Sequence, residues 1–160
     1  MIDTEDKLAW CAKGLEQEYE FIEKQGYNGV RFVMNPKKEE SPYAHDFLVM
    51  AQCDLKTMTT SWQHAQRMFD IPTEYAVSLN EKDLVRYSKL YPNIIVVMDV
   101  QYENYQGVHW SDLHRLRKLA HEGKARRHEY KNRKNDTKGN AKVSWIYDVR
   151  MLSRIEKNDD

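Results

Sequence analysis

Two carboxylates and a lysine near the middle of the chain have residue types and a spacing that could carry chemistry. Asp46 opens an apolar segment, and Asp54 and Lys56 lie in the next one. If the two segments pair as an antiparallel hairpin centred on Met50, Asp46 faces Asp54. Lys56 then lies on the same side, because side chains two apart on a strand share a face. Paired carboxylates suit Mg²⁺ or Mn²⁺, and a nearby ammonium can stabilise charge that grows on a phosphate.

The pattern of an acid, any residue and a lysine has low specificity by itself. It occurs five times, beginning at Glu5, Asp54, Glu122, Glu129 and Asp136. Only the copy at Asp54 lies in an apolar strand that follows another strand opening on an acid. The alternative is a surface hairpin whose polar face holds two acids and a lysine. The expected turn, residues 50–52, contains no Gly, Asn or Pro to favour a tight reversal.

The elements that would position these side chains follow from hydrophobic periodicity and turn residues. Helices are expected at 5–25, at 60–69, from an Asn80 cap to Tyr91 with Asp83 in an approximate capping box, and from a Ser111 cap to Gly123. Strands are expected at 29–34, 46–50, 52–56, 75–79, 94–98 and 143–149. The run at 94–98 is the most apolar in the chain and predicts a central strand covered on both faces. This order predicts an α/β fold, a single domain over 1–160 with a central mixed β-sheet flanked by helices.

Charge is unevenly distributed although the chain has 25 basic and 25 acidic residues. Residues 114–142 carry a net charge of +8, and the remainder carries −8. A basic segment on an acidic body points to nucleic acid, with a solvated surface run as the alternative. Residues 124–140 have almost no aliphatic side chain, which predicts a basic loop or arm at about 124–141. The residues expected to contact DNA phosphates are Arg115, Lys118, Arg126, Arg127, Lys131, Arg133 and Lys134.

Several classes of protein are disfavoured by composition. No apolar run approaches the roughly 20 residues that a bilayer crossing needs. The acidic start argues against a signal peptide, and two distant cysteines argue against a disulfide scaffold or a cysteine-rich zinc site. We therefore expect a protein without membrane association in a reducing cytoplasm, or a host cytoplasm if the compact polar chain is encoded by a phage or mobile element.

The order of these elements resembles the PD-(D/E)XK superfamily of restriction-endonuclease-like nucleases. An acidic helix and a strand precede the strand that opens on Asp46, and Asp54-Leu55-Lys56-Thr57 follows. The resemblance covers roughly the first hundred residues and rests on a short motif. Two departures stand out: the proline that usually precedes the first acid is displaced to Pro42, and the second acid is Asp54 where glutamate is commoner.

The resemblance implies a restriction-endonuclease-like core and a Mg²⁺-dependent deoxyribonuclease, with Mn²⁺ as a second metal. Asp46, Asp54 and the carbonyl of Leu55 would bind the metal, and Lys56 would activate the water and stabilise the transition state. A glutamate of the first helix would assist. The spacing Gly14-Leu15-Glu16 favours Glu16, whereas Glu18 lies nearer the apolar stripe and is kept as the alternative. An endonuclease is favoured over an exonuclease, and a homodimer is expected by analogy.

Two other functions stay open. One is a nucleic-acid-binding protein without catalysis on a nuclease-like scaffold, and the other is an inhibitor whose acidic body mimics nucleic acid. Trp62, Gln63 and Gln66 follow the Lys56 strand, and glutamines occur near the site in similar nucleases. We interpret them as a packed tryptophan and two exposed amides.

Overall fold

The structure, a computed structural model, describes residues 7–24, 28–41, 43–130 and 142–156. By its internal contacts the chain divides into two units, Met1–Ala51 and Gln52–Asp160, which we call the amino-terminal and carboxy-terminal units. The single domain expected over residues 1–160 stays a prediction. In the described ranges, no helix is long and apolar enough to cross a membrane.

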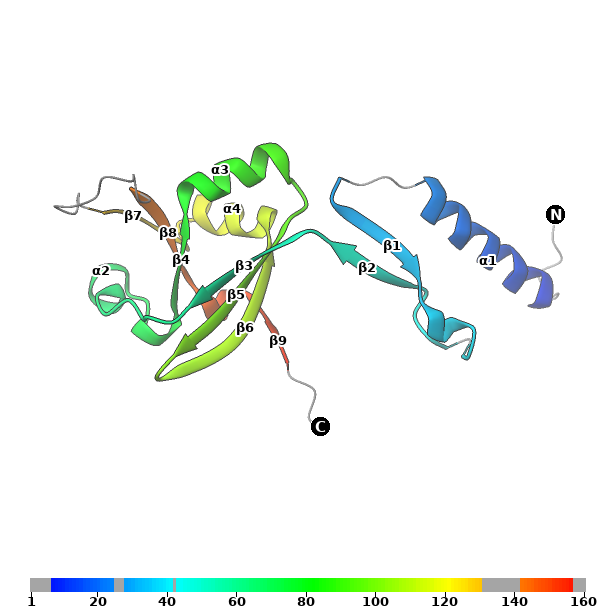
Figure 1. Cartoon of the computed structure of the whole chain (residues 1–160), viewed down its shortest axis with the longest axis horizontal. Helices are drawn as coiled ribbons and strands as arrows, with labels where there is room; N and C mark the ends of the chain where they lie inside the picture. Colours follow the sequence, from blue (N-terminus) through cyan, green and yellow to red (C-terminus); the bar gives the residue numbers. More distant parts are fainter. Residues whose placement is uncertain (1–6, 25–27, 42, 131–141, 157–160) are drawn as a thin grey trace. The chain divides into compact units, whose positions relative to one another are not determined.

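The amino-terminal unit consists of a helix packed on a two-stranded hairpin (Figure 1). Its elements are α1 (Lys7–Lys24), β1 (Val30–Met34), the 3₁₀ turn η1 (Pro36–Lys38) and β2 (Phe47–Ala51). β1 and β2 are antiparallel, with Met34 opposite Phe47. Phe21 of α1 packs against Phe32 and Phe47, with ring centroids 5.1 and 5.5 Å apart. These three rings join the helix to the hairpin.

Two sheets form the frame of the carboxy-terminal unit. The first has the strand order β3 (Cys53–Met58), β5 (Ile95–Tyr102), β6 (Tyr105–Asp112) and β9 (Ser153–Ile155). It is mixed, because β5 runs parallel to β3 and antiparallel to β6. The second is antiparallel, in the order β4 (Ala76–Asn80), β8 (Val143–Asp148) and β7 (Arg126–Glu129). In β4 and β8, Ala76 is paired with Asp148.

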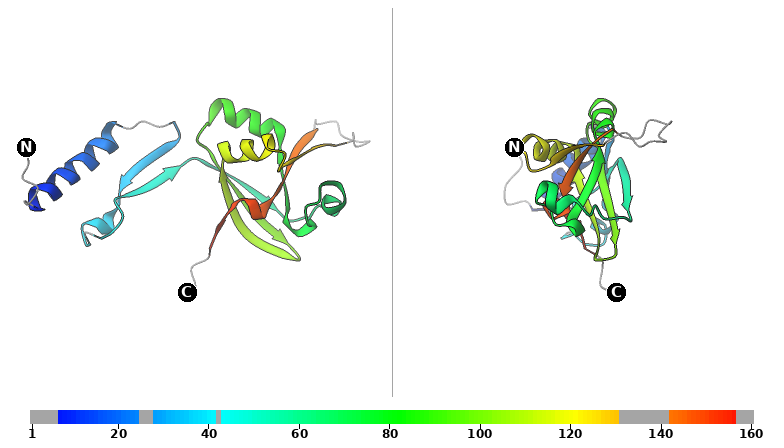
Figure 2. Two further views of the ribbon diagram at one scale, coloured as in Figure 1. Left: turned by 180° about the vertical axis from the view of Figure 1, so that it is seen from behind. Right: turned by 90° about the vertical axis from the view of Figure 1, so that its left-hand side faces the viewer.

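Helices α3 (Glu81–Leu90) and α4 (Leu113–His121) lie side by side and contribute to the main core with both sheets (Figure 2). On β5 the core side chains alternate along the strand: Val96 and Met98 are fully buried, whereas Ile95 and Val97 on the other face are half-buried. A smaller cluster lies around Ala65. The remaining short elements are α2 (Ala65–Phe69), η2 (Thr73–Tyr75) and η3 (Val149–Met151).

The predicted α/β class with a central mixed sheet flanked by helices is confirmed. The helices expected at 5–25, 80–91 and 111–123 correspond to α1, α3 and α4, and the six expected strands correspond to β1, β2, β3, β4, β5 and β8. β5 is an inner strand of its sheet, as its apolar run predicts, although only one of its faces is fully buried. The helix expected at 60–69 is shorter, since α2 begins at Ala65.

Local capping differs from expectation at two helices. Ser111 was expected to cap α4 but is a buried residue of β6, and the side chain of Asp112 accepts the hydrogen bond from the Arg115 backbone at 2.7 Å. Asn80 precedes α3 without capping it through its side chain, which instead accepts a hydrogen bond from the Ser144 hydroxyl at 3.1 Å. A tertiary partner thus replaces the local one at Asn80.

The hairpin expected between the strands of Asp46 and Asp54 is wrong. β2 pairs with β1, and β3 pairs with β5 in a different sheet. Only Gln52 separates β2 from β3, and its carbonyl accepts a hydrogen bond from the backbone of Ile95. A single residue is too short for an antiparallel reversal, for which two-residue loops are the common minimum. The pairing that placed Asp46 opposite Asp54 is therefore absent.

Part of the basic segment expected to be a loop or arm is ordered. Arg126–Glu129 form β7, an antiparallel partner of β8. His128 explains why this polar sequence docks, because its ring lies 4.7 Å from that of Trp62 and 4.6 Å from that of Tyr130. Residues 131–141 lie outside the described ranges.

Candidate functional site

A lysine bound by two carboxylates forms a cluster of charged side chains in the carboxy-terminal unit. Asp54 and Lys56 lie half-buried on one face of β3, whereas Cys53 and Leu55 are exposed on the other, as the alternation of a strand requires. Lys56 Nζ lies 2.9 Å from Asp54 Oδ2 and 3.2 Å from Asp83 Oδ2. The shared face predicted for Asp54 and Lys56 is thus present in β3 itself.

Helix α3 supplies the other half of this cluster. Asp83 and Tyr87 are four residues apart and therefore share one side of the helix, and both are buried. The Tyr87 hydroxyl donates a hydrogen bond to Asp54 Oδ2 at 2.6 Å. Arg86 lies 3.1 Å from Asp83 on the more exposed side. We call Asp54, Lys56, Asp83 and Tyr87 the Lys56 cluster; it joins β3 to α3.

The electrostatics of the Lys56 cluster favour its charged form. Burial alone would lower the pKa of Lys56, but the hydrogen bonds to Asp54 and Asp83 outweigh it, so that the pKa lies well above its ordinary value. Burial likewise acts to raise the pKa of Asp54, but the hydrogen bonds from Tyr87 and Lys56 hold it below its ordinary value. Lys56 is therefore an ammonium and Asp54 a carboxylate at neutral pH.

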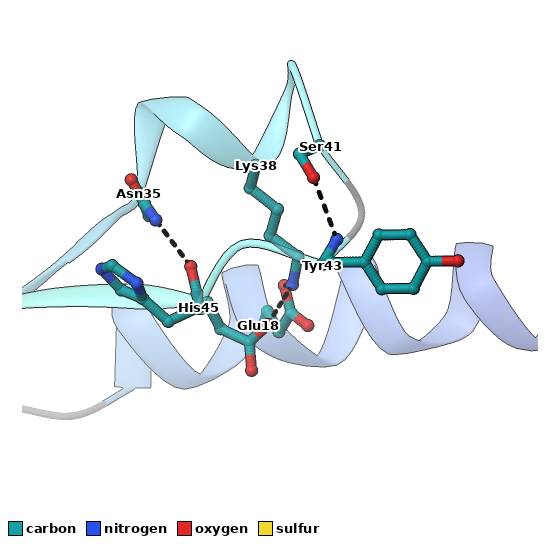
Figure 3. Close-up of polar contacts among 7 residues, drawn as sticks. Glu18, Asn35, Lys38, Ser41, Tyr43 and His45 are labelled. Atoms are coloured by element: carbon teal, nitrogen blue, oxygen red, sulfur yellow. Dashed lines mark hydrogen bonds and ion pairs between the residues drawn. The ribbon is translucent and has the colours of Figure 1, made fainter.

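A second lysine bound by two carboxylates lies in the amino-terminal unit. Lys38 Nζ donates hydrogen bonds to Glu18 of α1 and to Asp46, and Figure 3 shows its side chain pointing at Glu18. These contacts raise the pKa of Lys38, with the hydrogen bond to Asp46 as the largest cause. We call Glu18, Lys38 and Asp46 the Lys38 cluster. The side chain of Asp46 is 55% exposed, whereas those of Glu18 and Lys38 are about one-fifth exposed.

Asn35 fixes the loop that carries Lys38 and Asp46. It is buried, and its side-chain amide donates to the carbonyl of His45 at 2.8 Å (Figure 3). Its side-chain oxygen accepts from the Lys37 backbone at 3.1 Å, and its own backbone donates to the Asp46 carbonyl at 3.0 Å. One asparagine therefore ties both ends of the loop together.

The predicted site residues are divided between the two clusters, one in each unit. Asp54 and Lys56 contact each other, and Asp46 contacts Lys38. Of the two helix glutamates, Glu18 belongs to the Lys38 cluster, whereas Glu16 is exposed. The side chain of Leu55 is also exposed, on the opposite face of β3 from Asp54.

The donor chemistry of the Lys56 cluster is compatible with a hard cation. Across the described ranges, no group of three or more His, Cys, Asp or Glu side chains forms a candidate metal site. Asp54 and Asp83 nevertheless present two carboxylates to the same ammonium group. Mg²⁺ in phosphoryl-transfer sites uses one or two protein carboxylates and takes its other ligands from water and substrate phosphates. The pair of acids fits that requirement.

Four of the seven basic residues expected to contact DNA lie in the described part of the chain and are exposed. They are Arg115 and Lys118 on α4 and Arg126 and Arg127 on β7. Arg127 is paired with Glu81 through two hydrogen bonds of 2.9 and 3.1 Å. Arg126 instead donates to the carbonyl of Gly123, which leaves its charge unneutralised by that contact. Lys131, Arg133 and Lys134 lie outside the described ranges.

Two residues of the Lys56 cluster were missed in the sequence. The sequence predicts Asp83 to be part of an approximate capping box for α3 and predicts no role for Tyr87. Their four-residue spacing on a helix, with an acid next to an apolar position, was the available signal. It could not identify Lys56 as the partner, because that contact joins residues far apart in the sequence.

Comparisons with known proteins give one weak structural likeness. No family model matches the chain, and no curated protein matches it. The structure is similar to one described as D212, a nuclease from a fusselovirus, with a TM-score of 0.42 and 10% sequence identity. The likeness covers 90% of this chain and 81% of that chain. Because it is a likeness of backbone course at low identity, the function proposed next rests on the side chains.

Proposed function

We propose that the protein is a Mg²⁺-dependent deoxyribonuclease that hydrolyses phosphodiester bonds in DNA, as an endonuclease rather than an exonuclease. The observation that carries the proposal is the Lys56 cluster. An acid and a lysine two residues apart lie on one face of β3, and a buried acid from α3 contacts the same lysine. Carboxylates beside a protonated amine are the groups that a phosphodiester hydrolase needs.

Lys56 acts in this proposal as a donor of positive charge. Because its pKa is raised, it stays protonated and cannot accept a proton from water at neutral pH. Of the two roles that the resemblance implies for Lys56, we therefore assign stabilisation of the negative charge that grows on the phosphate. The hydrogen bond from Tyr87 keeps Asp54 deprotonated and fixes its orientation.

The metal would be held by Asp54 and Asp83 and, when bound, would supply a Lewis acid that polarises the phosphate. A cation at this place also offsets the repulsion between the carboxylates and the DNA backbone. The resemblance also assigns Asp46 and the Leu55 carbonyl to metal binding and a supporting role to Glu16 or Glu18, and these assignments can be tested in the same assay.

Basic residues outside the cluster would bind the DNA backbone. Arg115, Lys118 and Arg126 are exposed, and no carboxylate forms a close ion pair with Arg115 or Arg126 in the described ranges. Such residues contact phosphates without reading sequence, so that affinity falls as salt rises.

The test is cleavage of linear, nicked and branched DNA by pure protein with Mg²⁺ or with EDTA. We expect Mg²⁺-dependent cleavage that falls about 100-fold or more in Asp54→Ala and Lys56→Ala. Glu20→Ala is the control, because Glu20 forms an exposed 2.6 Å ion pair with Lys24 on α1, outside both clusters and outside the proposed DNA-binding residues. Unchanged cleavage by folded Asp54→Ala protein would contradict the proposal.

A nucleic-acid-binding protein without catalysis is the second candidate. It is favoured by the fact that both carboxylates already have cationic partners without a metal: Lys56 contacts Asp54 and Asp83, and Arg86 contacts Asp83. This candidate predicts salt-dependent DNA binding that is the same with Mg²⁺ and EDTA, and no cleavage under either condition.

A further inference from the structure

A pocket of about 440 Å³ lies at the end of β3, just beyond the Lys56 cluster. Met58, which lines it, shares the inward face of β3 with Lys56 two residues earlier. The volume falls in the range of roughly 300–1,000 Å³ that is usual for small-molecule sites. All of its lining residues belong to the carboxy-terminal unit.

Aromatic side chains form one wall of this pocket. Trp62 and Tyr130 both line it, with ring centroids 6.3 Å apart and ring planes tilted by 34°. Phe69 and His128 contact Trp62 at 5.2 and 4.7 Å but do not line the pocket, so they hold the indole in place without filling the space. Tyr130 keeps 37% of its surface exposed. The rings of Trp62 and Tyr130 therefore offer a surface on which a flat group could stack, and the position of Trp62 is fixed by its neighbours.

Residues with hydroxyl side chains form the part of the wall that follows β3. Thr59, Thr60 and Ser61 line the pocket in succession, and Ser78 of β4 is a fourth such residue. A hydroxyl can both donate and accept a hydrogen bond, so it can pair with the polar edge of any base. Aromatic faces with adaptable hydroxyls suit a flat heteroaromatic group that has a polar rim.

Positive charge lies on the strand that leads into the aromatic wall. Arg126 and His128 are two residues apart on β7 and share a face, and His128 contacts Trp62. A phosphate backbone near Arg126 would be attracted there, and a base attached to it could reach the wall. Bases inside a duplex are stacked and paired, so only an unpaired or extruded base offers its face.

We propose that this pocket receives an unpaired nucleobase of a DNA strand, stacked on Trp62 and Tyr130. The proposal rests on the proposed function and names its substrate class: DNA that contains a single-stranded or unstacked nucleotide. The base lies at the end of β3 while the Lys56 cluster, earlier on the same face, is left to the phosphate.

The experiment measures binding of the full chain to labelled oligonucleotides by fluorescence anisotropy in EDTA, where cleavage does not occur. The probes are a paired duplex, the same duplex with one bulged thymine, and the single strand. We expect the bulged and single-stranded probes to bind more tightly than the duplex. Because stacking on an aromatic side chain is worth about 1–3 kcal/mol per base, Trp62→Ala should weaken binding of the bulged probe about 5- to 150-fold and leave the duplex unaffected.

Further variants separate a stacking role from a folding role. Trp62 also packs in the smaller core, so Tyr130→Ala, which removes a more exposed ring, decides the matter if Trp62→Ala does not fold. Trp62→Phe and Tyr130→Phe keep a ring and should retain most of the preference. Tyr43→Ala is the control, because Tyr43 is 96% exposed in the amino-terminal unit. Equal affinity of the wild-type protein for all three probes would overturn the proposal, as would an unchanged preference in folded Tyr130→Ala protein.

The two proposals can fail separately. A preference for the bulged probe without cleavage in Mg²⁺ would support the pocket and reject the nuclease. Cleavage that depends on Asp54, with no preference between the probes in EDTA, would support the nuclease and reject the pocket.

Discussion

The Lys38 and Lys56 clusters have the same formal composition and very different surroundings. Each places one lysine between two acids. In the Lys56 cluster the second acid, Asp83, is buried and Tyr87 adds a hydrogen bond, whereas in the Lys38 cluster Asp46 is more than half exposed. Water screens the exposed pairs and reaches the buried ones poorly. Charge pattern alone therefore does not define a site, because burial and additional hydrogen bonds change the energy of the same ion pairs.

Removing the charge of Lys56 should lower the stability of the fold. Lys56→Met leaves Asp54 and the buried Asp83 without their shared cation, and we expect the free energy of unfolding to fall by about 1–3 kcal/mol. Lys38→Met should have a smaller effect, because Asp46 is 55% exposed and water can solvate its carboxylate, whereas Asp83 is buried. Urea unfolding followed by circular dichroism measures both. Equal decreases in the free energy of unfolding of the two variants would show that the burial of Asp83 makes no difference.

The cleavage rate tests whether the Lys38 cluster has a role in the reaction. If the Lys38 cluster assists cleavage, Glu18→Gln should reduce the rate about tenfold or more, since it removes a carboxylate from the cluster. Glu16→Gln is the matched control two residues earlier on α1, where the side chain is exposed. Initial rates on one DNA substrate in Mg²⁺ give the measurement. Equal rates for the two variants would leave the Lys38 cluster with a structural role only.

Acid should weaken the Lys56 cluster. The pKa of Asp54 is lower in the folded protein than its ordinary value, so the stability it contributes is present above pH about 4 and is lost as pH falls through the lowered value. Asp54→Asn removes this dependence, and its midpoint of urea unfolding should vary less between pH 5 and pH 3 than that of the wild-type protein. A variant with the full acid dependence would show that Asp54 is not its source.

The arginines of β7 should affect the salt dependence of DNA binding. Arg126 donates to a carbonyl and Arg127 is paired with Glu81. We expect Arg126→Ala to reduce the slope of log affinity for DNA against log salt by about one, the value for one phosphate contact. Arg127→Ala should change the slope less, because its charge is already compensated. The reverse order would show that the Glu81 pair opens on DNA.

Local hydrophobic periodicity predicted much of the fold. It failed at β6, where buried positions are occupied by polar residues. The apolar runs of β5 and β8 and the spacing in α1 were sufficient to locate these elements. β6 was missed because two of its buried positions are His109 and Ser111, which break the apolar alternation. His109 Nε2 shares a 2.7 Å hydrogen bond with the Tyr105 hydroxyl, four residues earlier on the same strand. Hydrophobic periodicity predicts such polar residues to be solvent-facing, so the strand was not predicted.

In the candidate site, too, the local relationships could be predicted and the long-range contacts could not. Asp54 and Lys56 share a face because a strand alternates every two residues, which is a local property. The expected partnership of Asp46 with Asp54 needed a hairpin that one linking residue cannot form. Asp83 joins Lys56 across 27 positions of the sequence, and that contact depends on where α3 packs.

The pairing of β4 with β8 has a consequence for the order of events during folding. Ala76 finds its partner only at Asp148, so this sheet cannot close until nearly all of the carboxy-terminal unit has been synthesised. The β1–β2 hairpin, by contrast, can form as soon as Ala51 is available. Closing long loops before contacts form slows folding. A ribosome-bound chain should therefore form its hairpin early, whereas β4 stays unpaired until late. The apolar side chains of β4, which are buried in the folded protein, are exposed during that time. We therefore expect β4 to be the segment that chaperones shield.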